Sequence, residues 1–335
     1  MPSFSATQTE STDLVEEGPG WRLEVDPEGD GERLDRFIAR RLPRVSRARA
    51  SRLEVWRLDS RGVCEQKLKK SARVKGGSIL WVRRPPPDED LSFLVQPSII
   101  DEHEDFLVID KPPGWVAHPT ASRYESAITT WLKKSGNSAQ PAHRLDSETS
   151  GVLLCVRDPK LEPMVHRLFL EHNVEKHYLA ITRVTPEGES RLQSGVRSWM
   201  EQRSLGFDKE SKVGLKMGMG DLKSCTQCEL LDQWYSPNFK EQRCLMRAKP
   251  LTGRQHQIRV HLSLAGFPLI GDKLYGPNEE YFLRALEGDL SEVDLDALGH
   301  DRQALHAERL ILPWCGGQLE WHSPLPQDLH ALLKA

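Results

Sequence analysis

Three consecutive prolines at positions 85 to 87 divide this chain more firmly than any other feature of its sequence. They are followed by three acidic residues, at positions 88 to 90. Proline fixes φ and has no amide proton, so such a run enters neither the interior of a helix nor the centre of a sheet. Pro-rich segments act as stiff spacers. The sequence therefore predicts a domain boundary here, with a linker over 86–95.

Charge is distributed unevenly on the two sides of this linker. The segment 31–85 has 17 Lys and Arg against 5 Asp and Glu, although the whole chain has a formal net charge of −3. Such asymmetry is typical of a protein with a nucleic-acid partner. A helical face at 33–42 and a second basic helix at 47–55, capped by Ser46, predict a small α/β RNA-binding module over 31–85. Its expected RNA contacts are Arg40, Arg41, Arg44, Arg47, Arg49, Arg52, Lys69 and Lys70. The alternative is a solvated basic face that binds nothing.

The first 30 residues are acidic and rich in Ser and Thr, which predicts a flexible tail. They contain no apolar core for a signal peptide, and no apolar run in the chain approaches the ~20 residues that span a bilayer. Six cysteines in 335 residues do not form a disulfide framework. We therefore expect a cytoplasmic protein with no membrane partner. Cys225 and Cys228 have a metal-like spacing, but on a strand they would face opposite sides, so neither zinc nor redox chemistry is expected.

The segment 96–335 mixes strands and helices without a regular βαβ period. Apolar runs predict strands at 106–109, 152–156 and 178–184, and a helix follows from 158 to 172. The expected fold class is therefore α+β, a mixed and mainly antiparallel sheet flanked by helices and loops. The stretch 186–222 looks like an insertion, and 284–303 is acidic and helical with no assigned chemistry.

A polar loop at 143–151 lies directly before a predicted buried strand. A carboxylate there, Asp146, would be held by a rigid element at the edge of the core, which suits a nucleophile or a general base. A loop whose Asp, Thr and Ser satisfy local backbone groups is the alternative. Tyr178, on the strand 178–184, could present its ring to a ligand or simply pack in the core.

The segment 251–262 carries several cationic and polar side chains. Thr252 is the expected N-cap of a helix that runs to about Ala265, which places Arg254 in the first turn on the same face as Ile258. A cation in the first turn opposes the helix dipole, so Arg254 is expected to have an anionic partner, either a buried carboxylate or a phosphate. Two histidines five residues apart do not share a face, so no metal site is expected.

These segments together resemble the RluA-type RNA pseudouridine synthases. The resemblance rests on three motifs, which are His143-Arg-Leu-Asp146 with Thr149 and Gly151, Lys111-Pro-Pro-Gly114 with His118, and Leu251-Thr-Gly-Arg254 followed by His256-Gln-Ile-Arg259. Gly271-Asp272 with Tyr275-Gly276, and Leu305-His-Ala307, continue it in family order. The basic segment 31–85 resembles the alpha-L RNA-binding module named for a ribosomal small-subunit protein. The resemblance implies a catalytic domain over 96–335 that isomerises uridine to pseudouridine without a cofactor or metal.

The resemblance also implies roles for individual residues. Asp146 would be the essential carboxylate, attacking covalently or abstracting a ribose proton, and Arg254 would form an ion pair with it that lowers its pKa. Tyr178 would stack on the uracil and Ile258 would pack beneath the pair. Arg144 would fill the place that the flipped base leaves in the RNA. His143 and Thr149 would support the loop, and Arg259 would line a basic cleft.

Large-subunit ribosomal RNA is the expected substrate, with transfer RNA as the alternative and a monomer as the expected state. Two other classes of function compete. One is an RNA-binding ribosome assembly factor without catalysis, and the other is a metal-dependent RNA hydrolase that uses the histidines.

Overall fold

The structure is a computed structural model that describes residues 20–42, 45–50, 53–59, 62–83, 89–120 and 123–333. The chain forms two compact units, divided between Asp88 and Glu89 inside the predicted linker. Residues 89–95 are not free spacer, because the Glu89 carboxylate accepts hydrogen bonds from the amides of Glu125 and Ser126 at 2.8 and 3.1 Å. The indole of Trp115 also donates to the carbonyl of Val95.

The N-terminal unit is a four-stranded antiparallel sheet with helices against it. The strand order is β1-β4-β2-β3, and the strands are β1 (Gly20–Glu24), β2 (Glu54–Leu58), β3 (Cys64–Lys67) and β4 (Ile79–Arg83). The helical elements are η1 (Pro27–Gly29), α1 (Leu34–Arg41) and α2 (Arg47–Ala50). The apolar face of α1 is buried as its spacing predicts, with Phe37 and Ile38 almost fully enclosed.

Two predictions for this unit need correction. The expected tail over 1–30 does not hold for 20–30, because β1 pairs with β4 and buries Leu23 and Val25; residues 1–19 lie outside the described part of the chain. The expected helix over 47–55 ends at Ala50. Val55 and Trp56 instead pair with Val82 and Trp81 of β4, because β-branched and aromatic side chains pack well on a sheet.

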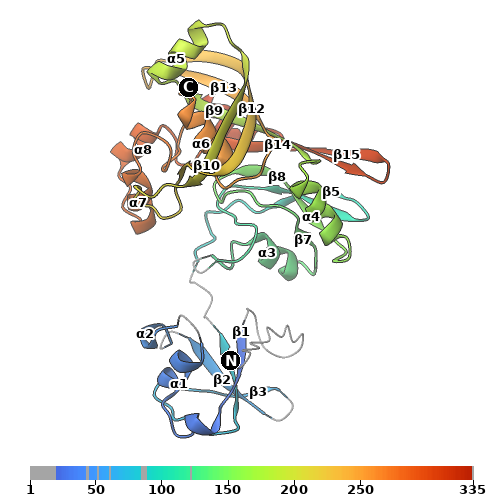
Figure 1. Ribbon diagram of the computed structural model, residues 1–335, viewed down its shortest axis with the longest axis vertical. Coiled ribbons are helices and arrows are strands. Elements are labelled where there is room, and N and C mark those ends of the chain that lie inside the picture. Colours follow the sequence, from blue (N-terminus) through green and yellow to red (C-terminus); the bar gives the residue numbers. More distant parts are fainter. Residues whose placement is uncertain are drawn as a thin grey trace. The chain divides into compact units, whose positions relative to one another are not determined.

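The C-terminal unit is built on an eleven-stranded, mostly antiparallel sheet with the order β11-β10-β12-β13-β9-β14-β8-β6-β5 (Figure 1). β15 extends it from β14 and β7 from β8, and β14 runs parallel to β8. The fold class is therefore α+β, as expected. The strands are β5 (Ser98–Glu102), β6 (Phe106–Lys111), β7 (Gln140–Pro141), β8 (Ser150–Val156), β9 (Glu175–Arg183), β10 (Ser198–Phe207), β11 (Met217–Met219), β12 (Leu222–Ser236), β13 (Glu241–Pro250), β14 (Leu305–Trp314) and β15 (Gly317–His322).

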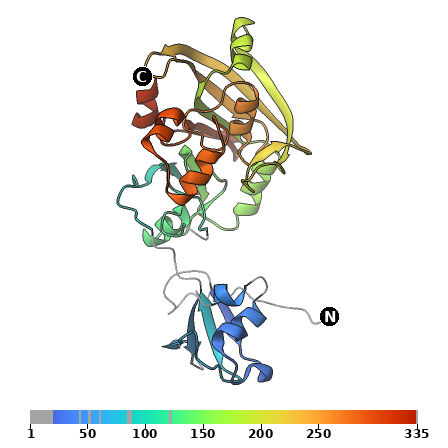
Figure 2. The same ribbon diagram turned by 90° about the vertical axis from the view of Figure 1, so that its left-hand side faces the viewer.

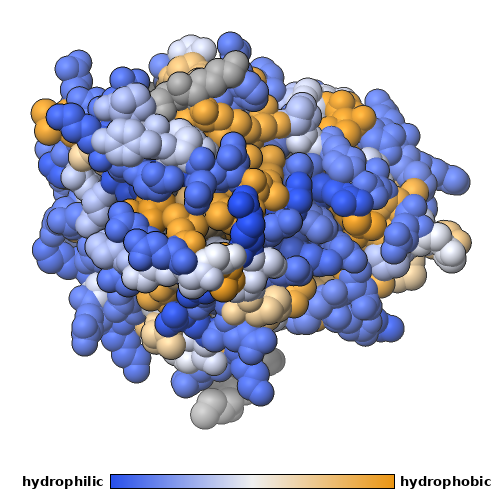
Figure 3. All heavy atoms as spheres, turned by 90° about the horizontal axis from the view of Figure 1, so that it is seen from above, coloured by the Kyte–Doolittle hydropathy of each residue, from blue (hydrophilic) through white to orange (hydrophobic). Residues whose placement is uncertain are grey.

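Seven helices of this unit are described. They are α3 (Ile128–Lys134), α4 (Glu162–Leu170), α5 (Pro186–Gln193), α6 (Gln257–Leu264), α7 (Glu280–Glu287), α8 (Glu292–Leu298) and α9 (Gln327–Leu332). The long strands β12 and β13 curve at one end of the sheet, and α6 lies against them (Figures 1 and 2). None of the described helices is long and apolar enough to cross a membrane. The surface in Figure 3 shows separate apolar patches between polar side chains.

The predicted insertion 186–222 is part of the sheet. Its first residues form α5, and the rest supplies β10, which pairs with β12, and β11, which pairs with β10. Leu205 of β10 and Met217 of β11 are buried against Val260 of α6. This segment therefore supports the helix that carries the site residues described next.

Candidate active site

A pocket of the C-terminal unit has a volume of about 630 Å³. Its walls come from five segments of the chain. They are the loop 142–149 before β8, the end of α4 at 169–172, the start of β9, the segment 250–259 that leads into α6, and Leu305 of β14. Its lining includes most of the predicted site residues, which are His143, Arg144, Asp146, Thr149, Tyr178, Arg254, Ile258 and Arg259. A pocket of this size can enclose a single nucleotide.

Asp146 lies on a loop that is held in place by hydrogen bonds from a buried lysine. The ammonium of Lys111 donates to the carbonyls of Pro112, Trp115 and Ser147, at 3.0, 2.9 and 3.2 Å. Three donors thus meet three acceptors in the core, and one of those acceptors is in the residue next to Asp146. The loop is thereby tied to the end of β6.

The ion pair of Asp146 is made by Arg259 and not by Arg254. Arg259 Nη1 lies 3.0 Å from Asp146 Oδ2, and its Nε and Nη2 bind both oxygens of Asp272 at 2.7 and 2.9 Å. Asp272 also accepts hydrogen bonds from the amides of Leu274 and Tyr275. Burial favours the neutral acid, but the Arg259 charge outweighs it and holds the pKa of the Asp146 carboxyl below its ordinary value.

Arg254 has a different position because the helix begins later than predicted. α6 starts at Gln257, after His256 in the left-handed conformation with φ 54°, so Arg254 is not in its first turn and shares no helix face with Ile258. Gln257 fixes the preceding turn, because its side-chain oxygen accepts from Thr252 Oγ1 at 2.6 Å and from the Arg254 amide at 3.0 Å. The Arg254 guanidinium donates to the carbonyl of Lys223 and is exposed at the pocket rim.

Tyr178 and Ile258 form an apolar wall beside the ion pair. Both are less than 10% exposed, and both belong to the main core cluster together with Leu145 and Leu305. Burial and the nearby Asp146 charge raise the pKa of the Tyr178 hydroxyl, so it is a neutral phenol. The wall is suited to stack against a flat base and to keep water from the carboxylate.

The other predicted loop residues lie around Asp146. Arg144 is exposed at the pocket rim. His143 stacks on Phe169 and accepts a hydrogen bond from the Leu154 amide at 3.1 Å, while burial lowers its pKa to about 3. Thr149 is buried and accepts from Gln303 Nε2 at 2.6 Å. His143 and Thr149 therefore brace the loop.

Sequence reasoning gave no role to Asp272, Tyr275, His256 or Lys111. Asp272 and Tyr275 were only part of a motif, Gly271-Asp272 with Tyr275-Gly276, and His256 was considered only as a metal ligand. The glycines of this motif were the available signal of a constrained loop. Gly271 has a φ of 73°, and a Cβ there would lie 1.9 Å from the Arg302 carbonyl oxygen. A loop so constrained places Asp272 under α6.

Nothing in the described residues groups three His, Cys, Asp or Glu side chains as a metal site would. Cys228 is buried in β12, where burial raises its thiol pKa to about 12, while Cys225 is partly exposed. This geometry is that of core packing.

The basic residues of the N-terminal unit differ in whether they form ion pairs within the unit. Arg40 and Arg41 pair with Asp26, Arg40 also with Glu32, and Arg47 with Asp35. Lys69 and Lys70 are exposed beside a surface hollow that Arg33 and Lys67 also line. Arg44 and Arg52 lie outside the described residues, as does the side chain of Arg49.

Comparison with known proteins shows which class of enzyme this fold and site define. A family model described as RNA pseudouridylate synthase matches residues 105–264. The chain is also 30% identical to ribosomal large subunit pseudouridine synthase D of Neisseria meningitidis serogroup A, over 93% of this chain and 80% of that protein. The chain therefore belongs to the RNA pseudouridylate synthase family and is an isomerase that converts uridine in RNA to pseudouridine.

Other similar proteins agree with this assignment. Proteins with the same description from Vibrio parahaemolyticus and Zymomonas mobilis are 30% and 29% identical, over 91% and 97% of this chain and the same shares of theirs. Among solved structures, human RNA pseudouridylate synthase domain containing 4 has the same fold, with a TM-score of 0.51 and 24% identity over 71% of this chain and 92% of that one. The family expected from the motifs is confirmed.

Proposed function

We propose that this enzyme isomerises a uridine of large-subunit ribosomal RNA, with Asp146 as the reacting carboxylate. The relatives whose descriptions name the large ribosomal subunit support this substrate. The observation that carries the proposal is the Asp146–Arg259 ion pair on the wall of a nucleotide-sized pocket. Arg259 keeps Asp146 ionised without competition from bulk solvent, which a nucleophile or general base requires.

The reaction needs a carboxylate and a pocket in which the detached uracil can rotate, and it involves no electron transfer. The bond between N1 of uracil and C1′ of ribose breaks, the base turns, and C5 bonds to C1′ while the C5 proton leaves and N1 gains one. Asp146 either attacks C1′ and forms an ester that the returning base displaces, or removes the ribose C2′ proton and later returns it. Both routes need an ionised Asp146 in contact with the ribose.

The pocket wall supplies the remaining steps. Tyr178 stacks on the uracil. Once the carbon–carbon bond has formed, its hydroxyl relays the C5 proton, taking it up as the phenol's own proton passes to the Asp146 carboxylate. Burial and the Asp146 charge raise the pKa of Tyr178, so the hydroxyl keeps its own proton until that transfer. Ile258 keeps water from the pair, and Arg144 at the rim occupies the gap in the RNA that the flipped base leaves.

The proposal extends to the whole chain. Lys69 and Lys70 of the N-terminal unit hold RNA through its phosphates, and Arg254 at the pocket rim binds a phosphate next to the target nucleotide. The enzyme acts as a monomer in the cytoplasm, where ribosomal RNA is assembled. Because the chemistry is an isomerisation, no cofactor or metal takes part.

The test is a map of pseudouridine in total RNA from cells with and without this gene. The proposal expects one or a few large-subunit sites to lose the modification, to regain it with the wild-type gene, and to stay unmodified with Asp146→Asn. Loss confined to transfer RNA would move the substrate to that class. An unchanged map, with a ribosome defect that Asp146→Asn rescues, would identify a non-catalytic assembly factor and overturn the proposal.

A further inference from the structure

His256 faces the reacting carboxylate but has no part in the steps above. Its Nε2 lies 4.0 Å from Asp146 Oδ2, the same oxygen that Arg259 binds, and its side chain is only 13% exposed. The backbone of His256 has φ 54° and ψ 17°, in the left-handed region that non-glycine residues adopt at a cost. This conformation at the start of α6 aims the ring into the pocket.

The other ring nitrogen of His256 is held by Tyr275. His256 Nδ1 and the Tyr275 hydroxyl are 2.9 Å apart, and the same hydroxyl accepts a hydrogen bond from the Met217 amide at 2.8 Å. Within the described part of the chain, the structure gives this hydroxyl no other partner. Tyr275 is 7% exposed, so its single proton needs an acceptor, and Nδ1 is the one in reach. His256 therefore carries its own proton on Nε2, the nitrogen that faces Asp146.

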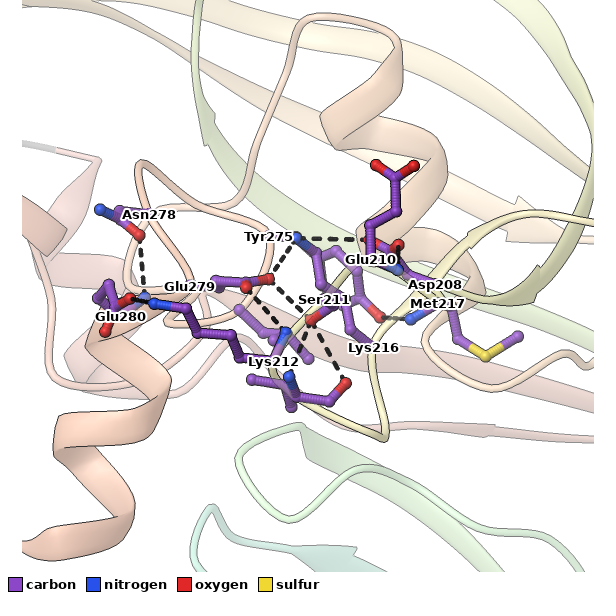
Figure 4. Close-up of polar contacts among 12 residues, drawn as sticks. Asp208, Glu210, Ser211, Lys212, Lys216, Met217, Tyr275, Asn278, Glu279 and Glu280 are labelled. Atoms are coloured by element: carbon purple, nitrogen blue, oxygen red, sulfur yellow. Dashed lines mark hydrogen bonds and ion pairs between the residues drawn. The ribbon is translucent and has the colours of Figure 1, made fainter.

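The Met217 amide is itself kept in place by a clamp on the segment 208–216 (Figure 4). The carboxylate of Glu279 accepts from Ser211 Oγ at 2.8 Å, from the Lys212 amide at 3.2 Å and from Lys216 Nζ at 2.7 Å. Lys216 and Ser211 lower the pKa of Glu279 to about 2, so the clamp is ionised at neutral pH. The insertion thus reaches the active site through one amide and one hydroxyl.

The charges near His256 favour a neutral ring. Burial and the Arg259 guanidinium lower its pKa to about 4, although Asp146 and Asp272 act in the opposite direction, and Arg144 adds to the lowering. A neutral imidazole has one N–H to donate, so the tautomer decides what the ring can do at the site. The tautomer is set by the hydrogen bond that the other nitrogen makes.

We propose that Tyr275 is a positioning residue that fixes His256 in the tautomer with its proton on Nε2, so that Nε2–H is presented to Asp146 Oδ2. Filling of the pocket by RNA closes the 4.0 Å gap to a hydrogen bond, and this second donor holds the carboxylate in its reacting orientation together with Arg259. The inference rests on the proposed role of Asp146. It gives the segment 208–217 of the insertion 186–222 a function in catalysis that is separate from RNA binding.

The tautomer is measured by NMR of protein with ¹⁵N-labelled histidine, in which the two ring nitrogens have different shifts when protonated and unprotonated. His256 is assigned among the 12 histidines as the signal that His256→Gln removes. The wild-type protein is expected to show only the Nε2–H form, and Tyr275→Phe a mixture of both forms. Tyr281→Phe on α7 is the matched control and should leave the spectrum unchanged. An unchanged tautomer in Tyr275→Phe would overturn the proposal.

Single-turnover kinetics on the target RNA give the second readout. Tyr275→Phe is expected to lower the rate of pseudouridine formation about tenfold, the effect of one hydrogen bond, with RNA affinity unchanged. His256→Gln keeps an N–H at the position of Nε2, whereas His256→Asn keeps one only at the position of Nδ1. The Gln variant should therefore retain more activity than the Asn variant, and equal rates would contradict the proposal. If the wild-type enzyme modified no RNA, the proposed function would fail while the tautomer measurement still stood.

Discussion

Arg259 connects Asp146 to the core of the enzyme, donating one hydrogen bond to the Asp146 carboxylate at 3.0 Å and two to the fully buried Asp272. One guanidinium thus serves two carboxylates, with only Asp146 open to the pocket. Because Asp272 is also bonded to two backbone amides, the arginine cannot swing away from it without leaving buried groups unpaired. The loop at 271–275 therefore determines the orientation of Asp146 through Asp272 and Arg259.

This ion pair predicts how activity depends on pH. In its proposed role Asp146 acts as a carboxylate. Because its pKa in the folded enzyme is below the ordinary value, activity is expected to persist as pH falls past about 3.9 wherever the fold survives. In Arg259→Met/Asp272→Asn the guanidinium is gone while burial remains, so the pKa of Asp146 should rise. As pH is lowered, this variant should therefore lose activity at a higher pH than the wild type does. Single-turnover rates across pH check this, with circular dichroism as the control for folding. Loss of activity at the same acidic pH in the wild type and in the double variant would contradict the account.

Asp272 is predicted to matter for both stability and rate. Asp272→Asn removes one bond to Arg259 and its countercharge but keeps an oxygen for the two amides, so the free energy of unfolding should fall by about 3 kcal/mol. The freed guanidinium can then turn toward Asp146 or solvent, and the rate should fall as well. Urea denaturation and single-turnover rates measure the two effects. A stable variant with the wild-type rate would show that Asp272 does not position Arg259.

Gly151 tests how β8 and β14 come together behind the Asp146 loop. Its φ is 112°, and a Cβ there would lie 2.2 Å from the carbonyl oxygen of Ala307. Gly151→Ala should therefore destabilise the C-terminal unit by about 3 kcal/mol, from both strain and overlap. Gly136→Ala is the matched control, since it has a φ of 73° but no atom within 4 Å, and it should cost only about 1 kcal/mol. Equal losses in urea denaturation would mean that the close approach is not rigid.

The N-terminal unit makes a separate prediction about RNA affinity. Lys69→Gln/Lys70→Gln removes two exposed cations, and the slope of log affinity against log salt should fall in magnitude by about 2. The single-turnover rate at saturating enzyme should not change, because neither lysine lines the pocket. Lys160→Gln/Lys240→Gln, two exposed lysines of the C-terminal unit, is the control for loss of charge alone. If both double variants had the same slope, the predicted RNA contacts would be wrong.

Much of the fold was predictable because its signals are local. The strands at 106–109 and 152–156 are continuous apolar runs, and α1 has its apolar residues on one face. The helix expected at 47–55 failed where Val55 and Trp56 join a sheet, because pairing with a distant strand overrides local propensity. The insertion 186–222 was unassigned for the same reason, since β10 is defined by its pairing with β12 and β11 by its pairing with β10.

The sequence predicted which segments meet at the site. It did not predict which arginine forms the ion pair with Asp146. Arg254 was expected to have an anionic partner because a helix was expected to begin at Thr252, and the family resemblance then paired it with Asp146. The real start at Gln257 depends on a positive φ at His256 and on side-chain bonds of Gln257, which no periodicity reveals. Arg259 is then the arginine whose side chain reaches Asp146 and Asp272 together.

The most direct test of the account compares these two arginines in the chemical step. Single-turnover pseudouridine formation on the target ribosomal RNA is measured at saturating enzyme for the wild type, Asp146→Asn, Arg259→Lys and Arg254→Lys. The account predicts no product with Asp146→Asn, a loss of about 100-fold with Arg259→Lys, and a rate within about threefold of the wild type with Arg254→Lys. A large loss with Arg254→Lys beside a nearly unaffected Arg259→Lys would contradict it.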